Sequence, residues 1–219
     1  GDLASARKYA EASTTLRDEM VADSKRLLDV MGIPSIDAPS EGEAQAAVMA
    51  AEGSVDAVAS QDHDSLLFGA PILARNITIS GKRRLPSKNV FVEVEPETIS
   101  LPETLKRLEL TREQLVDLGI LLGTDFNPEG FRGIGPVKGL KLLKEHGSLE
   151  RINELKQGLS QIDFPAIRAI FLNPPVTRGL GISWGSFKAD AVRSLLVDEH
   201  SFSRERVDAA IGRIEQVNS

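Results

Sequence analysis

Three short acidic motifs contain the side chains whose type and spacing suit metal-dependent chemistry. Together they supply five carboxylates: Glu41, Glu43, Asp62, Asp64 and Asp125. If the five converge in the fold, their mutual repulsion requires divalent cations, and ligation by oxygen alone favours Mg²⁺ or Mn²⁺ over zinc. A pair of such cations would hold a scissile phosphate and activate water for in-line attack.

Two of the motifs lie at expected helix ends. Ser40 and Glu43 have the spacing of a helix capping box, in which Glu43 serves the helix start rather than a metal. Asp125 follows the end of an expected helix, where a carboxylate opposes the helix dipole unless a cation offsets it. A structural role is therefore harder to assign to Asp125 than to Glu41 or Glu43.

The remaining pair, Asp62 and Asp64, follows an expected buried strand at 55–59. In extended chain, residues at i and i+2 point the same way, and the carboxyl ends of parallel strands are where α/β sheets build ligand sites. An alternative stays open, in which Asp64 caps a helix and Asp62 is a solvated loop residue. The same alternation turns His63 away from the pair, which argues against a zinc site.

A glycine-rich segment from Gly130 to Leu140 predicts a phosphate-binding turn. The glycines around Ile134 let a backbone approach a phosphate closely, and Pro136 begins a helix whose free amides favour an anion. Such a turn binds duplex backbone without reading sequence. The candidate contacts are Arg132, Gly133, Ile134, Gly135, Lys138 and Lys141, with Lys144 further along the helix. A second candidate phosphate contact is the basic turn of Lys82 and Arg83 with Arg84 and Lys88, which is equally well a solubilising hairpin tip.

The elements that must position these residues alternate between helices and strands in the first half of the chain. A helix is expected at 2–31 with Asp2 as its N-cap, another at 40–52, and strands at 55–59, 72–79 and 90–94. This order predicts an α/β fold with a mainly parallel central sheet flanked by helices. From Thr111 onward the pattern is helical, with Thr111 as a cap.

Composition sets broader limits on the function. The 219 residues carry a net charge of −6, so a nucleic-acid partner requires acidic and basic groups to be segregated. No apolar run approaches the roughly 20 residues of a membrane helix. The absence of cysteine excludes disulfides and thiolate metal sites and fits a cytoplasmic location.

Six segments together resemble the archaeal flap endonucleases of the 5′-nuclease superfamily. They are APSEGEAQAA at 38–47, SQDHDSLLFGA at 60–70, NITISGKR at 76–83, LGTDFNP at 122–128, FLNPPV at 171–176 and EHSFS at 199–203. The resemblance implies that the five carboxylates bind the active-site metals of a 5′-nuclease, PIN-like core. It further implies a helix–two-turn–helix that grips duplex DNA and holds K⁺ through backbone carbonyls.

The resemblance also implies a division of the chain and a biological role. Residues 1–110 would belong to the nuclease core, 111–150 to the helix–two-turn–helix, and 151–219 to a helical region packed on the core. The substrate would be double-stranded DNA with a 5′ flap, cut near the junction during replication and repair in the nucleoid of an archaeal cell. The sliding clamp would be a partner of the parent protein.

Family members begin well before Gly1 and contribute two further aspartates from that part, so we expect this chain to be an incomplete core that is inactive alone. Its expected partner is the missing amino-terminal segment, and the clamp-docking tail of the family is not found before Ser219. Two other interpretations stay open: a non-catalytic DNA-binding fragment, and another 5′-nuclease of the exonuclease or excision-repair type.

Overall fold

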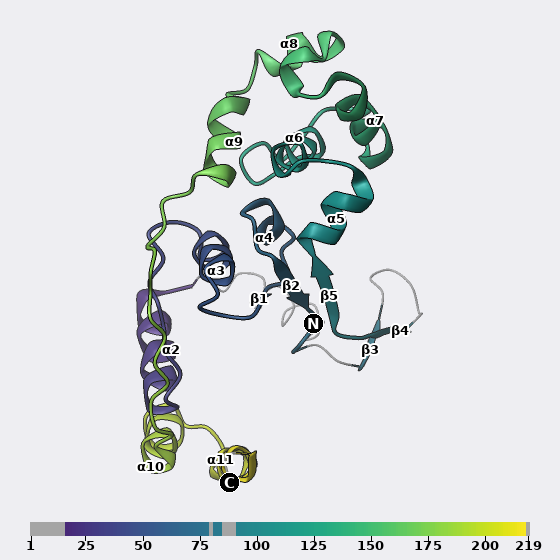
Figure 1. The fold of residues 1–219 in the computed structure, drawn as a ribbon. Helices are drawn as coiled ribbons and strands as arrows, with labels where there is room; N and C mark the ends of the chain where they lie inside the picture. Colours follow the sequence, from purple (N-terminus) through teal and green to yellow (C-terminus); the bar gives the residue numbers. More distant parts are fainter. Residues whose placement is uncertain (1–15, 79–80, 85–90, 218–219) are drawn as a thin grey trace, which may run out of the picture. The chain divides into compact units, whose positions relative to one another are not determined.

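The computed structural model describes residues 16–78, 81–84 and 91–217 (Figure 1). The chain divides into two compact units, one made of Gly1–Ile36 with Ile182–Ser219 and the other of Asp37–Gly181. These units differ from the three consecutive segments expected at 1–110, 111–150 and 151–219. The first unit combines both ends of the chain because the helix α2, Asp18–Val30, packs against α10, Ala189–Arg193.

The larger unit contains a three-stranded sheet in the order β1, β2, β5. Strand β1 is Val58–Ala59, β2 is Ile72–Arg75 and β5 is Glu97–Ser100. Strands β1 and β2 run parallel, whereas β2 and β5 run antiparallel. The sheet is therefore mixed rather than mainly parallel.

The connections explain this difference from the expected sheet. The helix α4, Asp64–Leu67, lies between β1 and β2, as a parallel crossover requires. No helix is described between β2 and β5; in the described part of that connection, β3 (Gly81–Arg84) and β4 (Phe91–Val94) form an antiparallel pair. The α/β class itself is confirmed.

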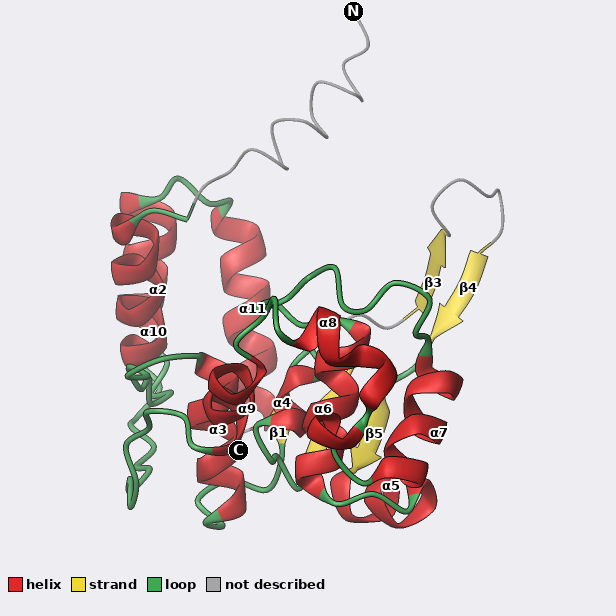
Figure 2. Ribbon diagram, turned by 90° about the horizontal axis from the view of Figure 1, so that it is seen from above, coloured by secondary structure: helices red, strands yellow, loops and turns green. Residues whose placement is uncertain are grey.

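Helices pack around this sheet to form one hydrophobic core (Figure 2). The helix α6, Arg112–Leu122, is largely buried and contacts three others. Its predicted cap is confirmed, because the Thr111 hydroxyl accepts from the Gln114 amide and the Gln114 side chain accepts from the Thr111 amide. Besides α4 and α6, the described helices of the unit are α3 (Gly42–Ala51), α5 (Leu101–Leu108), α7 (Pro136–His146), η1 (Leu149–Arg151), η2 (Asn153–Leu155), α8 (Lys156–Leu159) and α9 (Phe164–Leu172).

The described part of the smaller unit consists of helices and the loops that join them. Besides α2 and α10 it contains the π-helix η3, Ser194–Glu199, and α11, Arg204–Val217. The expected continuous helix over 2–31 is wrong, because Leu16 and Arg17 are not helical and α2 begins at Asp18. Asp18 and Glu19 favour that start through the helix dipole.

Asp2, the expected N-cap of that helix, lies outside the described residues. Where α2 ends, Gly32 has a φ of +74°, and a side chain at this position would meet the backbone of Gly185. None of the helices in the described ranges combines the length and apolar character that a membrane crossing needs.

Candidate metal centre

Three of the predicted carboxylates converge in the larger unit. Oxygen atoms of Asp62, Asp64 and Asp125 all lie within 4.8 Å of one another, which is a spacing that a shared cation can span. Asp62 and Asp64 follow the carboxyl end of β1, and Asp125 follows α6. Segments far apart in the sequence therefore bring their acids to one place.

Glu41 and Glu43 line the same pocket as the three aspartates, together with the aromatic rings of Phe68 and Phe126. The capping-box interpretation of Ser40 and Glu43 is wrong. Glu41 is the N-cap of α3, and its side chain makes no capping hydrogen bond. The Ser40 hydroxyl instead donates to the carbonyl of Pro175 at 2.8 Å.

Hydrogen bonds connect the first two acidic motifs to each other. The Ser60 hydroxyl donates to Oε1 of Glu43 at 3.3 Å and accepts from the amide of Asp62 at 3.1 Å. Oδ1 of Asp62 accepts from the amide of Asp64 at 2.9 Å. Sequence reasoning assigned no role to Ser60, although a Ser hydroxyl can form a turn by bonding the backbone two residues further on.

The alternative that made Asp64 a helix cap is also wrong, because Asp64 is the first residue of α4 and His63 occupies the cap position. Among the described residues, His63 is not a member of the metal-binding group, and its side chain is exposed.

The electrostatics of the pocket show how closely the acids crowd. Burial, followed by the negative charges of Asp62, Asp125, Glu43 and Glu41, raises the pKa of Asp64 to about 6. All four neighbours therefore act on one carboxyl group. A cation bound among the five carboxylates would relieve this repulsion. The ligand atoms that these five residues offer to a cation are all carboxylate oxygens.

The predicted phosphate-binding turn leads into α7. Ile134 is only 9% exposed, whereas Gly133 and Gly135 on either side of it are exposed. Gly133 has a φ of +80°, and a Cβ atom built on either glycine meets nothing within 4 Å. The turn thus anchors itself through Ile134 and leaves open space beside the glycine backbone.

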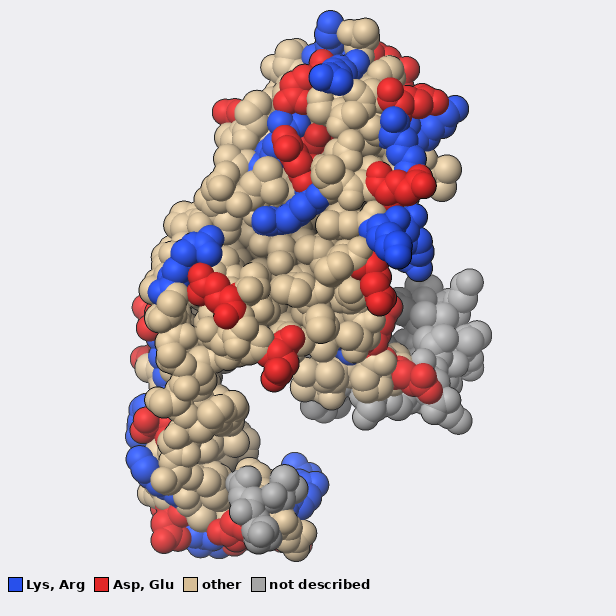
Figure 3. Space-filling model, in the orientation of Figure 1, with Lys and Arg blue, Asp and Glu red and all other residues tan. Residues whose placement is uncertain are grey.

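The basic side chains near this turn differ in their surroundings. Arg132, Lys138 and Lys141 are exposed, and Lys141 lies 3.7 Å from Glu145. Lys144 pairs with Glu109 and is the least available of the helix's lysines. On the face drawn in Figure 3, basic and acidic side chains are interspersed over the region of α5 to α7.

The second candidate phosphate contact is only partly described. Lys82 and Arg83 lie on β3, which pairs with β4, so the expected hairpin is present in its backbone. The side chains of these two residues and the whole of Lys88 lie outside what the structure describes. Their role stays a prediction.

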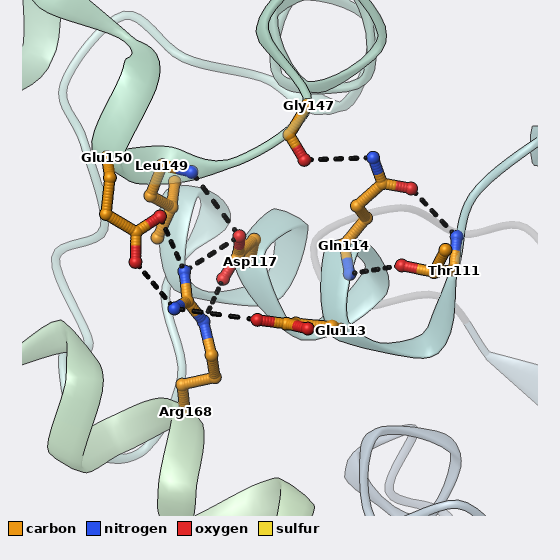
Figure 4. Close-up of polar contacts among 8 residues, drawn as sticks. All are labelled: Thr111, Glu113, Gln114, Asp117, Gly147, Leu149, Glu150 and Arg168. Carbon is orange, nitrogen blue, oxygen red and sulfur yellow. Dashed lines mark hydrogen bonds and ion pairs between the residues drawn. The ribbon is translucent and has the colours of Figure 1, made fainter.

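A buried ion pair fixes the middle of α6, the helix that precedes Asp125 (Figure 4). Asp117 is fully buried and accepts from Arg168 of α9 at 2.7 and 3.0 Å. Arg168 also donates to Glu150 at 2.7 Å, and the Gln114 side chain donates to the carbonyl of Gly147. Sequence reasoning missed this network, which joins α6 to the segment after α7 and to α9.

Comparisons with known proteins agree with this fold and site. Residues 32–125 match the family described as the XPG I-region, which includes all five carboxylates. Flap endonuclease 1 of Pyrococcus furiosus is 51% identical over 216 residues, covering 99% of this chain and 63% of the relative. The flap endonuclease 1 of Staphylothermus marinus is 50% identical over 218 residues, covering 98% of this chain and 61% of the relative.

Solved structures give the same assignment. The flap endonuclease-1 from Methanococcus jannaschii superposes with a TM-score of 0.76 at 38% identity, over 96% of this chain and 62% of that one. The catalytic core of Rad2 in complex with DNA substrate gives 0.71 at 25% identity, over 94% of this chain and 70% of that one. The fold is that of the 5′-nucleases.

Within that class, the chain is a homologue of the archaeal flap endonucleases. It spans 61–63% of the length of the two curated relatives described above.

Proposed function

We propose that the full-length protein is a structure-selective DNA endonuclease that cuts 5′ flaps near the duplex junction. The observation that carries this proposal is the convergence of Asp62, Asp64 and Asp125 in one pocket with Glu41 and Glu43. Clustered carboxylates at the end of a strand are suited to a reaction on phosphodiester bonds when cations accompany them. The similarity to flap endonucleases supplies the substrate class.

The residues present fit Mg²⁺ or Mn²⁺. The described metal-binding group offers only carboxylate oxygens, and such hard donors suit these ions rather than zinc. The three aspartates would hold the ions, with Glu41 and Glu43 completing the pocket wall. When bound, a pair of such ions would supply a water nucleophile and stabilise the charge that develops on the phosphate.

The glycine-rich turn and α7 would grip the duplex. The space beside the backbone of Gly133 and Gly135, where a Cβ atom would lie, is open, and Pro136 begins a helix whose N-terminal amides favour an anion. Arg132, Lys138 and Lys141 would add charge to that contact, with Lys82 and Arg83 as a second one. This assigns a helix–two-turn–helix to residues 111–150, with K⁺ held by its backbone carbonyls.

Two other interpretations are weighed against this proposal. A non-catalytic DNA-binding fragment would have no need for three converging aspartates. Another 5′-nuclease, of the exonuclease or excision-repair type, is less favoured, because the identity is 51% to a flap endonuclease and 25% to Rad2. We extend the proposal to replication and repair in the archaeal nucleoid, with the sliding clamp as a partner of the full-length protein.

A panel of DNA substrates tests the proposal. The full-length protein with Mg²⁺ should cleave a 5′-flap substrate near its junction, faster than a blunt duplex or a single strand, and a chelator should stop the reaction. Stepwise degradation of a blunt duplex from its 5′ end would favour the exonuclease interpretation. Binding of the flap substrate without any cleavage would favour the non-catalytic one.

A further inference from the structure

The loop that carries Asp125 runs from the end of α6 to the glycine-rich turn and positions this aspartate differently from the other acids. Asp62 and Glu43 each have a hydrogen bond that orients the carboxylate. No hydrogen bond within the described ranges holds the carboxylate of Asp125. The place of this carboxylate therefore depends on the backbone that carries it.

Two polar side chains close that loop around Asp125. The hydroxyl of Thr124 donates to Oδ1 of Asn127 at 2.7 Å, and Nδ2 of Asn127 donates to the carbonyl of Ile120 at 2.7 Å. The amide of Asn127 also donates to the carbonyl of Thr124 at 3.0 Å. Asn127 thus binds the last turn of α6 and the residue before Asp125 with a single side chain.

The Ile120 carbonyl is one of the acceptors that a helix end leaves without an internal partner, so Asn127 also serves α6 as a C-terminal cap. The next carbonyl, of Leu121, accepts from the amide of Phe131 at 2.9 Å. The end of α6 is therefore bonded to both sides of the loop. Thr124 is only 7% exposed, which protects its hydrogen bond from water.

Two glycines show how tightly the same loop doubles back on itself. Gly123 has a φ of +110°, and a Cβ there would approach the carbonyl oxygen of Pro128 to 2.8 Å. A Cβ on Gly130 would come within 2.6 Å of Leu122. The Thr124 hydroxyl also accepts from the amide of Phe126 at 3.3 Å, so the side chains of Thr124 and Asn127 hold the tip of this closely folded loop.

We propose that Thr124 and Asn127 are positioning residues for the metal centre, holding the backbone of Asp125 so that its carboxylate meets Asp62 and Asp64. This inference rests on the proposed function, because it assumes that the converging aspartates bind divalent cations. Neither Thr124 nor Asn127 lines the pocket of the five carboxylates. Their effect on the metal site passes through the position of Asp125.

Three variants of the full-length protein separate this role from a purely structural one. Thr124→Val keeps the shape of the side chain and removes the hydroxyl, Thr124→Ser keeps the hydroxyl, and Asn127→Ala removes both side-chain bonds. Mn²⁺ binding is measured by titration calorimetry without DNA, alongside the melting temperature and the KM for a flap substrate. Partners that orient a metal ligand typically contribute 10- to 100-fold in metal affinity.

We expect Thr124→Val and Asn127→Ala to bind Mn²⁺ about 10-fold or more weakly, with the KM for flap DNA little changed and Thr124→Ser close to wild type. A lower melting temperature with wild-type Mn²⁺ affinity in both variants would overturn the positioning role. Equal losses in Thr124→Val and Thr124→Ser would also contradict it, because the hydroxyl would then be irrelevant.

The same titrations distinguish this failure from failure of the proposed function. If the wild-type protein and the variants bind Mn²⁺ equally well, only the positioning role is overturned. Wild-type protein that binds no Mn²⁺ overturns both proposals.

Discussion

Ser60 illustrates, at the scale of single residues, how one small side chain organises several charged ones. Its hydroxyl donates to Glu43 and accepts from the amide of Asp62, so it joins the acids of α3 to those that follow β1. A hydrogen bond to a carboxylate restrains its orientation and lowers the cost of presenting it to a cation. The candidate metal centre therefore also depends on a residue that carries no charge.

Replacing Ser60 with alanine should weaken metal binding without abolishing cleavage. We expect the Mg²⁺ concentration for half-maximal flap cleavage to rise about 10-fold, the lower part of the range for partners of metal ligands. Ser54→Ala is a matched control, because Ser54 donates to the carbonyl of Leu180 and does not line the pocket. An unchanged Mg²⁺ requirement in Ser60→Ala would show that this hydroxyl has no role in the site.

The five carboxylates could be predicted from the sequence because acids at strand and helix ends are distinctive in type and position. Ser60, Thr124 and Asn127 could not, since small polar residues occur in most turns and their partners appear only in three dimensions. Asn127, for example, donates to a carbonyl seven residues earlier, across a loop whose path the sequence does not specify.

At the scale of elements, α7 offers lysines of two kinds. Lys138 and Lys141 are highly exposed, with Lys141 only 3.7 Å from Glu145, whereas Lys144 forms a close ion pair with Glu109. Replacing both Lys138 and Lys141 with alanine should weaken duplex binding equally for all sequences and flatten its salt dependence by up to about one unit of slope per lost contact. DNA affinity measured over a series of salt concentrations checks this.

Lys144→Ala is the control on the same helix and should change the salt slope less. A slope unchanged by the double substitution would mean that Lys138 and Lys141 face solvent in the complex. The glycine-rich turn would then have to bind phosphate through its backbone alone.

The network that fixes α6 predicts a pH dependence of stability. Hydrogen bonding to Arg168 lowers the pKa of Glu150 to about 2 from an ordinary value of 4.5. Because the folded-state pKa is the lower one, ionised Glu150 stabilises the fold above about pH 4.5 and loses this effect as the pH falls toward 2. Asp117 acts oppositely, because burial raises its pKa despite the hydrogen bonds from Arg168.

Glu150→Gln should therefore reduce the loss of stability on acidification within this window. Denaturant unfolding at a series of pH values gives the comparison, with Glu154→Gln as a control that removes another exposed carboxylate from the same region. Parallel pH profiles for Glu150→Gln and the wild type would contradict the assigned role of Glu150.

Element types followed from the sequence better than their pairing did. Helices α3 and α6 lie where the periodicity places them, and the cap at Thr111 is present. The antiparallel strand β5 was missed because the direction of a strand depends on the connection that precedes it. The expected continuous helix over 2–31 was wrong because hydrophobic periodicity does not mark the break at Arg17.

At the scale of the whole molecule, the net charge and the order of the elements bear on where DNA and metal ions would bind. A net charge of −6 opposes DNA binding, so the contacts must come from local basic groups such as Arg132, Lys138 and Lys141. Asp125 and the glycine-rich turn follow the same helix, α6. The chain thereby places the candidate metal centre next to the glycine-rich turn, the candidate site of duplex binding.

The pairing of the chain's two ends in the smaller unit was not predicted. The side chain of Arg26 in α2 donates twice to Glu199 in η3, at 2.9 Å each. Such contacts join residues that are far apart in the sequence, whereas hydrophobic periodicity reports only on neighbours. Division of the chain by sequence alone therefore produced consecutive segments.

The central claim is that the converging carboxylates bind the cations that cleave DNA. Its most direct test compares Asp62→Asn and Asp125→Asn with the wild-type full-length protein, measuring flap cleavage at saturating Mg²⁺ and flap binding in parallel. We predict that cleavage falls by more than the roughly 100-fold upper limit for an outer partner of a metal ligand, while binding is largely retained. Wild-type cleavage rates in either variant would contradict the account.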